Sequence, residues 1–205
     1  MPHNEDASKR PLRIGIISAE IGSHCVSYFL LSLVLGCDSS QAEFYLFPSK
    51  DRHTEPRWAV FEQHAVHFEC IEQLSDDQAC SLIRGFRLDV VLETSQHMTS
   101  NRLALMARRL APVQAHYIGM HGTTGVPAVD YFIGDAWITP AEFAGQFTET
   151  LLRLPRTWVC FTPPEQLPPL RATDGKPPVR LGCFNNVSKI SRACMKLWAQ
   201  VMQEL

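Results

Sequence analysis

Two histidines and a glycine-rich segment are the residues of this sequence best suited to chemistry at a ligand. His24 and His97 each follow a short apolar run, and residues 119–125 (Gly-Met-His-Gly-Thr-Thr-Gly) follow a third. A histidine can exchange a proton near neutral pH, and glycines let a backbone approach a ligand closely. Each feature also has a structural explanation. A histidine can cap a helix, which is the more common case, and a glycine-rich segment can be a tight turn.

Lys189 is a further candidate, because it follows the apolar run 179–184 and precedes a helical pattern. A lysine beside a helix N-terminus can hold a phosphate. A lysine exposed to solvent is the more frequent case, so the residue type alone leaves both interpretations open.

Three residues have a spacing that resembles a metal site, namely His64, His67 and Cys70. No fourth ligand lies near them in the sequence, and the spacing fits no standard zinc pattern. No nucleophile elbow that would indicate a Ser-His-Asp enzyme is present either. We therefore expect no metal site at these residues.

The elements that must position these residues alternate between strand-like and helix-like patterns. Apolar runs predict buried parallel strands at residues 13–18, 44–47, 90–92, 113–118 and 130–135. Helical patterns cover residues 26–35, 58–68 (ending in a short strand), 75–85 after an N-cap at Ser75, 103–110, and 139–142 after an N-cap at Thr139. This succession predicts a Rossmann-like, doubly wound α/β fold. Ligands of such sheets bind beyond the carboxyl ends of the strands, where His97 and residues 119–125 are expected.

Composition predicts four segments. Residues 1–12 form a disordered N-terminal segment, 13–161 a Rossmann-like domain, 162–178 a proline-rich linker, and 179–205 the start of a second, incomplete domain. In the last segment we expect a strand at residues 179–184 and an amphipathic helix at 191–205. A lone strand and helix cannot bury their own apolar faces, so we expect a partial chain.

The overall composition limits the class of partner. The chain has 205 residues, 45% hydrophobic content and a formal net charge of −2. This balance favours neither nucleic acid nor anionic membrane as a partner, and no apolar run could span a bilayer. The seven cysteines include no CxxC pair, which favours a reducing, cytoplasmic environment over a disulfide framework.

Four groups of segments resemble the catalytic region of the SPINDLY and O-linked N-acetylglucosamine transferase family. They are residues 13–18 with 24–29 (His-Cys-Val-Ser-Tyr-Phe); 88–93 (Leu-Asp-Val-Val-Leu-Glu) with His97 and Asn101; 111–114 (Ala-Pro-Val-Gln), 118–125 and Asp130-Tyr131; and 182–190 (Gly-Cys-Phe-Asn-Asn-Val-Ser-Lys-Ile) with Trp198. They occur in the order that the family has. The resemblance is somewhat nearer to the SPINDLY branch.

The resemblance implies a two-domain GT-B fold, of which this chain would hold the N-terminal half and the first βα unit of the second domain. It implies inverting transfer of GlcNAc or a related sugar from a nucleotide sugar, UDP-GlcNAc or GDP-fucose, to Ser or Thr of a protein, without a cofactor or an essential metal. As a partial chain, the protein is expected to be inactive alone.

The resemblance also implies roles for single residues. His24 and His97 would line the acceptor side, and Lys189 would steady the diphosphate as a third catalytic group. The donor would contact Gly119, His121, Gly122, Thr123, Asn186 and Lys189. The family's usual Gly-Tyr-Pro is Gly119-Met120-His121 here. This difference supports the alternative of a non-catalytic, degenerate binding module.

Overall fold

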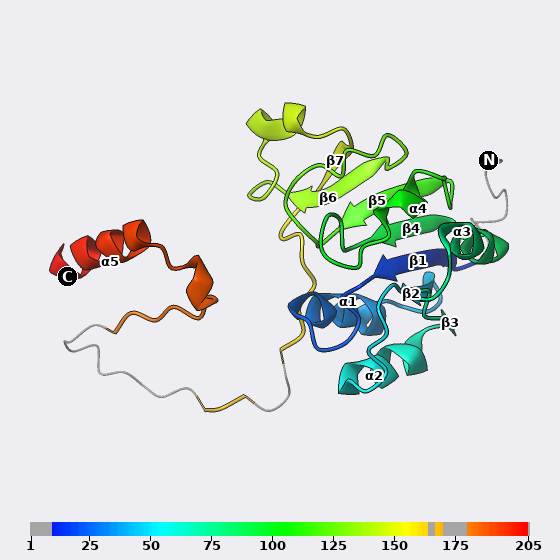
Figure 1. Cartoon of the computed structure of the whole chain (residues 1–205), viewed down its shortest axis with the longest axis horizontal. Coiled ribbons are helices and arrows are strands. Elements are labelled where there is room, and N and C mark those ends of the chain that lie inside the picture. The colour runs from blue at the N-terminus through cyan, green and yellow to red at the C-terminus, as the bar shows by residue number, and fades with distance from the viewer. Residues whose placement is uncertain (1–9, 164–166, 170–179, 205) are drawn as a thin grey trace. The chain divides into compact units, whose positions relative to one another are not determined.

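Seven parallel strands form one sheet in the order β3-β2-β1-β4-β5-β6-β7 (Figure 1). The computed structural model describes residues 10–163, 167–169 and 180–204. The strands are β1 (Leu12–Ser18), β2 (Ala42–Pro48), β3 (His67–Phe68), β4 (Val90–Glu93), β5 (Val113–Tyr117), β6 (Tyr131–Asp135) and β7 (Thr150–Leu154). The predicted α/β, doubly wound architecture is confirmed.

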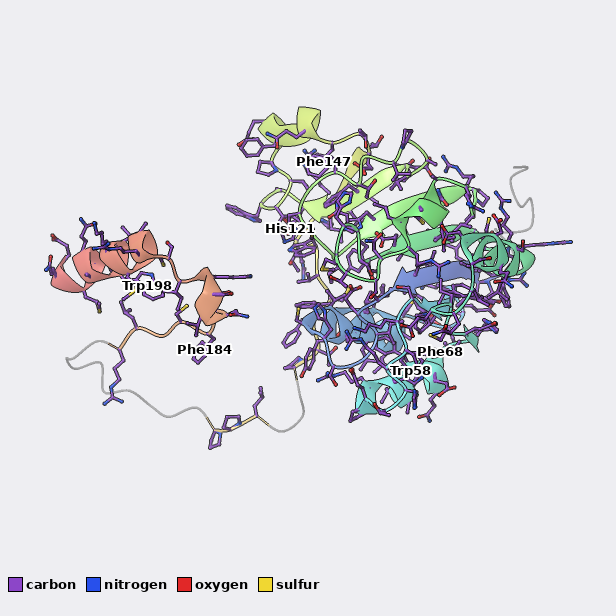
Figure 2. The ribbon with its side chains drawn as sticks, viewed as in Figure 1. Trp58, Phe68, His121, Phe147, Phe184 and Trp198 are labelled. Atoms are coloured by element: carbon purple, nitrogen blue, oxygen red, sulfur yellow. The ribbon has the colours of Figure 1, made fainter. Side chains whose placement is uncertain are left out.

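Helices cover both faces of this sheet (Figure 1). They are α1 (Cys25–Gly36) and α2 (Pro56–His64) on one face, and α3 (Asp76–Gly85) and α4 (Leu103–Met106) on the other. Successive strand residues point to opposite faces. Ile16 and Leu46 therefore pack with α1 and α2, while Ile17 and Phe47 pack with α3 and α4. Trp58 of α2 closes the first core at the sheet edge, with its ring 4.9 Å from that of Phe68 (Figure 2).

The start of α3 confirms the predicted N-cap. The Ser75 hydroxyl accepts a hydrogen bond from Gln78 N, and the Gln78 side chain accepts one from Ser75 N. This capping box satisfies two backbone donors that the first turn leaves free. Asp76 and Asp77 add negative charge at the positive end of the helix.

The predicted helix over residues 103–110 is wrong in its length, because α4 ends at Met106. The side chain of Gln114 replaces the missing helical bonds: its amide donates to Met106 O at 2.8 Å and its carbonyl accepts from Leu110 N at 2.8 Å. Arg109 has a φ of 54°, which no helix contains. A buried glutamine from the next strand therefore ends this helix.

The predicted α-helix after Thr139 is also wrong. A 3₁₀ helix, η2 (Ala141–Gln146), follows Pro140 instead. The Thr139 hydroxyl donates to Asp135 O at 2.7 Å and so does not cap the following helix. Gly145 lies in the same segment and disfavours a longer helix.

The structure describes only the last part of the N-terminal segment that was predicted to be disordered. Of the predicted N-terminal segment 1–12, residues 1–9 lie outside the described residues, whereas Arg10 forms an ion pair with Asp89 and Leu12 begins β1.

None of the described helices has the length and apolarity needed to cross a bilayer.

The chain divides into two compact units, Met1–Pro163 and Pro164–Leu205. In the second unit, the structure describes η3 (Val187–Lys189) and α5 (Arg192–Glu204), which agrees with the predicted amphipathic helix. The predicted strand at residues 179–184 is wrong for its described part, residues 180–184, which are exposed and form no strand. A strand needs a hydrogen-bonded neighbour, and this part of the chain offers none among its described residues.

Candidate functional site

The carboxyl ends of β1, β4 and β5 carry three neighbouring loops. We call them the β1 loop (residues 19–24), the β4 loop (residues 94–102) and the glycine loop (residues 119–125). The chain leaves β1 toward β2 on one side, while β4 and β5 lie on the other side. The border between β1 and β4 is therefore the topological switch point, where open parallel sheets bind ligands.

Hydrogen bonds join the β1 loop to the β4 loop. Ser95 is central, since its hydroxyl accepts from Ala19 N at 2.8 Å and donates to Glu20 Oε2 at 2.6 Å. The same carboxylate oxygen accepts from Ser18 Oγ at 3.1 Å and from Thr94 Oγ1 at 3.3 Å. Glu20 is buried, so this network holds the two loops in a fixed relation across the switch point.

The β4 loop is joined to the glycine loop in turn. The Gln96 side chain donates to Gly122 O. Gly119 lies so close to the β4 loop that a Cβ added to it would overlap the carbonyl oxygen of Thr94. Two residues near the starts of these loops have a positive φ: Gln96 in the β4 loop, at 47°, and Ile118 directly before the glycine loop, at 75°. Such a φ is rare for a β-branched residue and is found where the surroundings enforce it, often at functional sites.

His24 begins α1 as its N-cap, as the structural alternative predicted. Its Nδ1 accepts from Val26 N at 3.3 Å, and the ring is half-buried. Among the described residues, Nε2 of His24 has no hydrogen-bond partner. The loop before it is held by Glu55, which accepts from Ser23 N and pairs with Arg52 at 2.8 Å. The cap therefore orients the ring and leaves one nitrogen available at the switch point.

His97 lies exposed on the β4 loop, directly after the Gln96 that holds the glycine loop. The structure thus brings the segments of His24, His97 and residues 119–125 together along one edge of the sheet. The roles of these residues toward a ligand stay predictions.

Glu149 anchors the glycine loop from the start of β7. Its Oε1 accepts from Thr124 N at 2.7 Å and from the Thr124 hydroxyl, and its Oε2 accepts from Thr123 Oγ1 at 2.8 Å. Burial alone would raise the pKa of this carboxyl. The hydrogen bonds from Thr124 and Thr123 outweigh burial, so the pKa lies below its ordinary value of 4.5.

Acid should weaken this anchor. A group with a lowered folded-state pKa stabilises the fold above its unfolded pKa and loses that contribution as the pH falls through the folded pKa. Glu149→Gln should therefore cost stability at about pH 7 and cost less at about pH 3, which is below the ordinary pKa of 4.5, because the contribution of the carboxylate is lost as the pH falls. Urea unfolding of both proteins at the two pH values measures this. If the difference in free energy of unfolding between the two proteins does not change with pH, the lowered pKa of Glu149 is contradicted.

His121 extends from the glycine loop onto Trp158, with ring centroids 4.5 Å apart in an edge-on arrangement (Figure 2). The pKa of His121 lies below its usual value, mainly because the ring is partly desolvated. A neutral imidazole at the rim of the loop can accept a hydrogen bond from a ligand hydroxyl. Gly122 has open space where a side chain would be, so the loop is accessible there.

Sequence reasoning missed the buried acids that hold these loops, namely Glu20, Glu93, Asp135 and Glu149. Asp135 accepts from the backbone nitrogens of Trp137 (2.8 Å), Ile138 (2.9 Å) and Trp158 (2.9 Å). These bonds, led by the one from Ile138, lower the pKa of Asp135. For Glu20, Glu93 and Asp135 a usable signal was present, because an acid at or just after the end of a buried apolar strand is unusual.

Asn186 and Lys189 belong to the second unit. Asn186 caps η3, since its Oδ1 accepts from Ser188 N at 3.0 Å, and Lys189 is exposed. Their contact with a donor stays a prediction. In the described part of the chain, no group of three or more His, Cys, Asp or Glu side chains could hold a metal ion.

Comparison with known proteins identifies one family. The model of glycosyl transferase family 41 matches residues 1–170. Proteins named probable UDP-N-acetylglucosamine–peptide N-acetylglucosaminyltransferase SPINDLY are 32% identical to this chain, over 97% of it in Solanum lycopersicum and 95% in Arabidopsis thaliana. The chain spans 22% of the length of each. A mutant O-GlcNAc transferase of Thermobaculum terrenum matches with a TM-score of 0.90 and 32% identity, over 99% of this chain and 38% of that one.

Proposed function

Because the chain belongs to glycosyltransferase family 41, we propose that it forms part of the active site of a protein O-glycosyltransferase. The reaction is inverting transfer of GlcNAc or a related sugar from a nucleotide sugar, UDP-GlcNAc or GDP-fucose, to Ser or Thr of a protein. The free cysteines support action in a reducing cytoplasm.

The observation that carries the proposal is the joining of three loops at the switch point. Hydrogen bonds through Ser95 and Gln96 hold the β1, β4 and glycine loops as one edge. His24, whose Nε2 has no hydrogen-bond partner among the described residues, lies in the first loop, and Gly122, with open space at its Cβ position, lies in the last. Such an edge suits a sugar, whose many hydroxyls need fixed polar partners, and an acceptor that must lose a proton.

The proposed roles divide between the two units. His24 and His97 line the acceptor side, and Gly119, His121, Gly122 and Thr123 contact the donor sugar. Asn186 and Lys189 hold the diphosphate. Negative charge builds up on the departing diphosphate, so a fixed lysine stabilises the transition state more than the bound donor. In this mechanism no metal or cofactor is essential.

One observation favours the alternative of a non-catalytic binding module. Gly119 is followed by Met120 and His121, and the His121 ring lies against Trp158. The imidazole occupies part of the rim where a sugar would lie. A module of this kind would hold a peptide or partner and transfer nothing.

Calorimetric titration of the chain with UDP-GlcNAc and with GDP-fucose tests donor binding. We expect one donor to bind and Lys189→Ala to weaken it about tenfold or more, because a charge-assisted phosphate contact is lost. The control is Lys196→Ala on α5. Absence of binding by both donors, or equal effects of the two lysine variants, would contradict the proposal. Because the partial chain is expected to be inactive alone, mass spectrometry of a Ser/Thr peptide incubated with the donor and a chain extended by the second domain then separates transfer from binding alone.

A further inference from the structure

A buried pair, Glu93 and His116, lies beneath the glycine loop and makes none of the ligand contacts proposed above. The two residues are opposite each other in β4 and β5, and both side chains have 0% exposure. His116 Nδ1 is 3.1 Å from Glu93 Oε2. The pair therefore joins the central strands at the point where the β4 loop and the glycine loop begin.

Glu93 fixes the start of the β4 loop. Its Oε1 accepts from the backbone nitrogens of Ser95 and Gln96, both at 2.8 Å, and its Oε2 accepts from Gln96 N at 2.9 Å. Gln96 in turn donates to Gly122 of the glycine loop. The Glu93 carboxylate thus controls the residue that holds the far end of that loop.

His116 supports the near end of the glycine loop. A Cβ built on Gly119 would lie 2.9 Å from His116 Cε1 and 3.2 Å from Nε2, so the distal edge of the ring lies against the Gly119 backbone. Phe132 packs on the same ring, with centroids 5.1 Å apart. Nε2 is buried and has no hydrogen-bond partner among the described residues. A buried nitrogen without a hydrogen-bond partner is rare in proteins, so the position of Nε2 needs an explanation.

We propose that His116 is a positioning residue for the glycine loop. It is a neutral imidazole that donates Nδ1–H to Glu93 and supports Gly119 with its distal edge. The proton belongs on Nδ1 because that nitrogen faces a carboxylate. Nε2 then carries only a lone pair, which avoids an unpaired buried N–H. The inference rests on the proposed function only where it concerns the donor, because the glycine loop is the proposed contact of the donor sugar.

Two variants test separately the two edges of the His116 ring, the Nδ1 edge that faces Glu93 and the distal edge that faces Gly119. His116→Asn retains an N–H close to the position of Nδ1 and removes the distal edge. Glu93→Gln keeps the shape of the carboxylate and offers an amide N–H to Nδ1, which should move the His116 proton to Nε2. The control is His53→Asn, a histidine on the loop after β2 whose side chain is 71% exposed.

Long-range ¹H–¹⁵N correlation of the ring nitrogens and amide hydrogen exchange test the proposal in the full chain. We expect the Nδ1–H tautomer for His116 in the wild type and the Nε2–H tautomer in Glu93→Gln. In His116→Asn we expect about tenfold faster exchange at Thr124 N, with unchanged exchange in β1 and at Gln96 N. His53→Asn should leave all of these signals unchanged.

Three results would overturn the proposal: an Nε2–H tautomer in the wild type, unchanged exchange at Thr124 in His116→Asn, or an equal increase throughout β1. The last would make His116 an ordinary core residue. The tautomer measurement needs no substitution at His116, so it holds even if that variant fails to fold. None of these signals requires a donor, so failure of donor binding and failure of loop positioning are distinguished.

Discussion

Gly119→Ala should lower the free energy of unfolding by about 3 kcal/mol, because the added methyl group overpacks a site that is already filled. The new Cβ would overlap Thr94 O and lie 2.9 Å from His116 Cε1. Neither neighbour can yield, because the Thr94 backbone is bonded to Ile17 O in β1 and His116 is fully buried. Urea unfolding measures the loss.

Gly122→Ala is the matched control in the same loop. No atom lies within 4 Å of the position that its Cβ would occupy. We expect a change of no more than about 0.5 kcal/mol, which is typical of substitutions that touch nothing. Equal losses for the two alanine variants would show that the contact with Thr94 and His116 is not what fixes the loop.

Glu93→Ala should destabilise the protein by about 3–5 kcal/mol, because it leaves buried donors without an acceptor. The donors are Ser95 N, Gln96 N and the Nδ1–H of His116. For a domain of this size, the melting temperature should fall by roughly 10 °C. Thermal unfolding followed by circular dichroism measures it.

Two comparisons make this second prediction specific. Glu62→Ala removes an exposed acid from α2 and should leave the melting temperature nearly unchanged. The double variant Glu93→Ala/His116→Ala should cost less than the sum of the single changes, since the two side chains depend on each other. Additive costs would mean that Glu93 and His116 act independently, contrary to the proposed pair.

The central strands of the sheet were predictable from the sequence because they are buried on both faces, whereas the largely exposed edge strand β7 was not predicted. Runs such as Ile14–Ile17 and Val90–Leu92 are apolar at successive positions, and only a strand covered on both sides requires that. Helix ends were less predictable. The end of α4 depends on Gln114, which belongs to the next strand, and local sequence carries no record of that contact.

The sequence predicted where the candidate site lies better than it predicted which residues hold its loops in place. His24, His97 and the glycine loop lie at carboxyl ends of strands, so the topology of a parallel sheet predicts their common edge. The acids that hold these loops were missed, because burial of Glu93 or Glu149 depends on neighbours from other strands and loops. The strand expected at residues 179–184 failed for its described part, because a strand forms only beside another strand.

We propose that the β1, β4 and glycine loops form one edge, with the donor sugar at the glycine loop and the acceptor beside His24 and His97. Amide chemical-shift mapping during titration with UDP-GlcNAc and with GDP-fucose tests it most directly. We expect the donor that binds to shift the amides of residues 119–125 directly, and those of residues 22–24 and 96–97 with them through the hydrogen bonds of Ser95 and Gln96, with one common dissociation constant. Shifts confined to other residues, or different dissociation constants for the three loops, would contradict it.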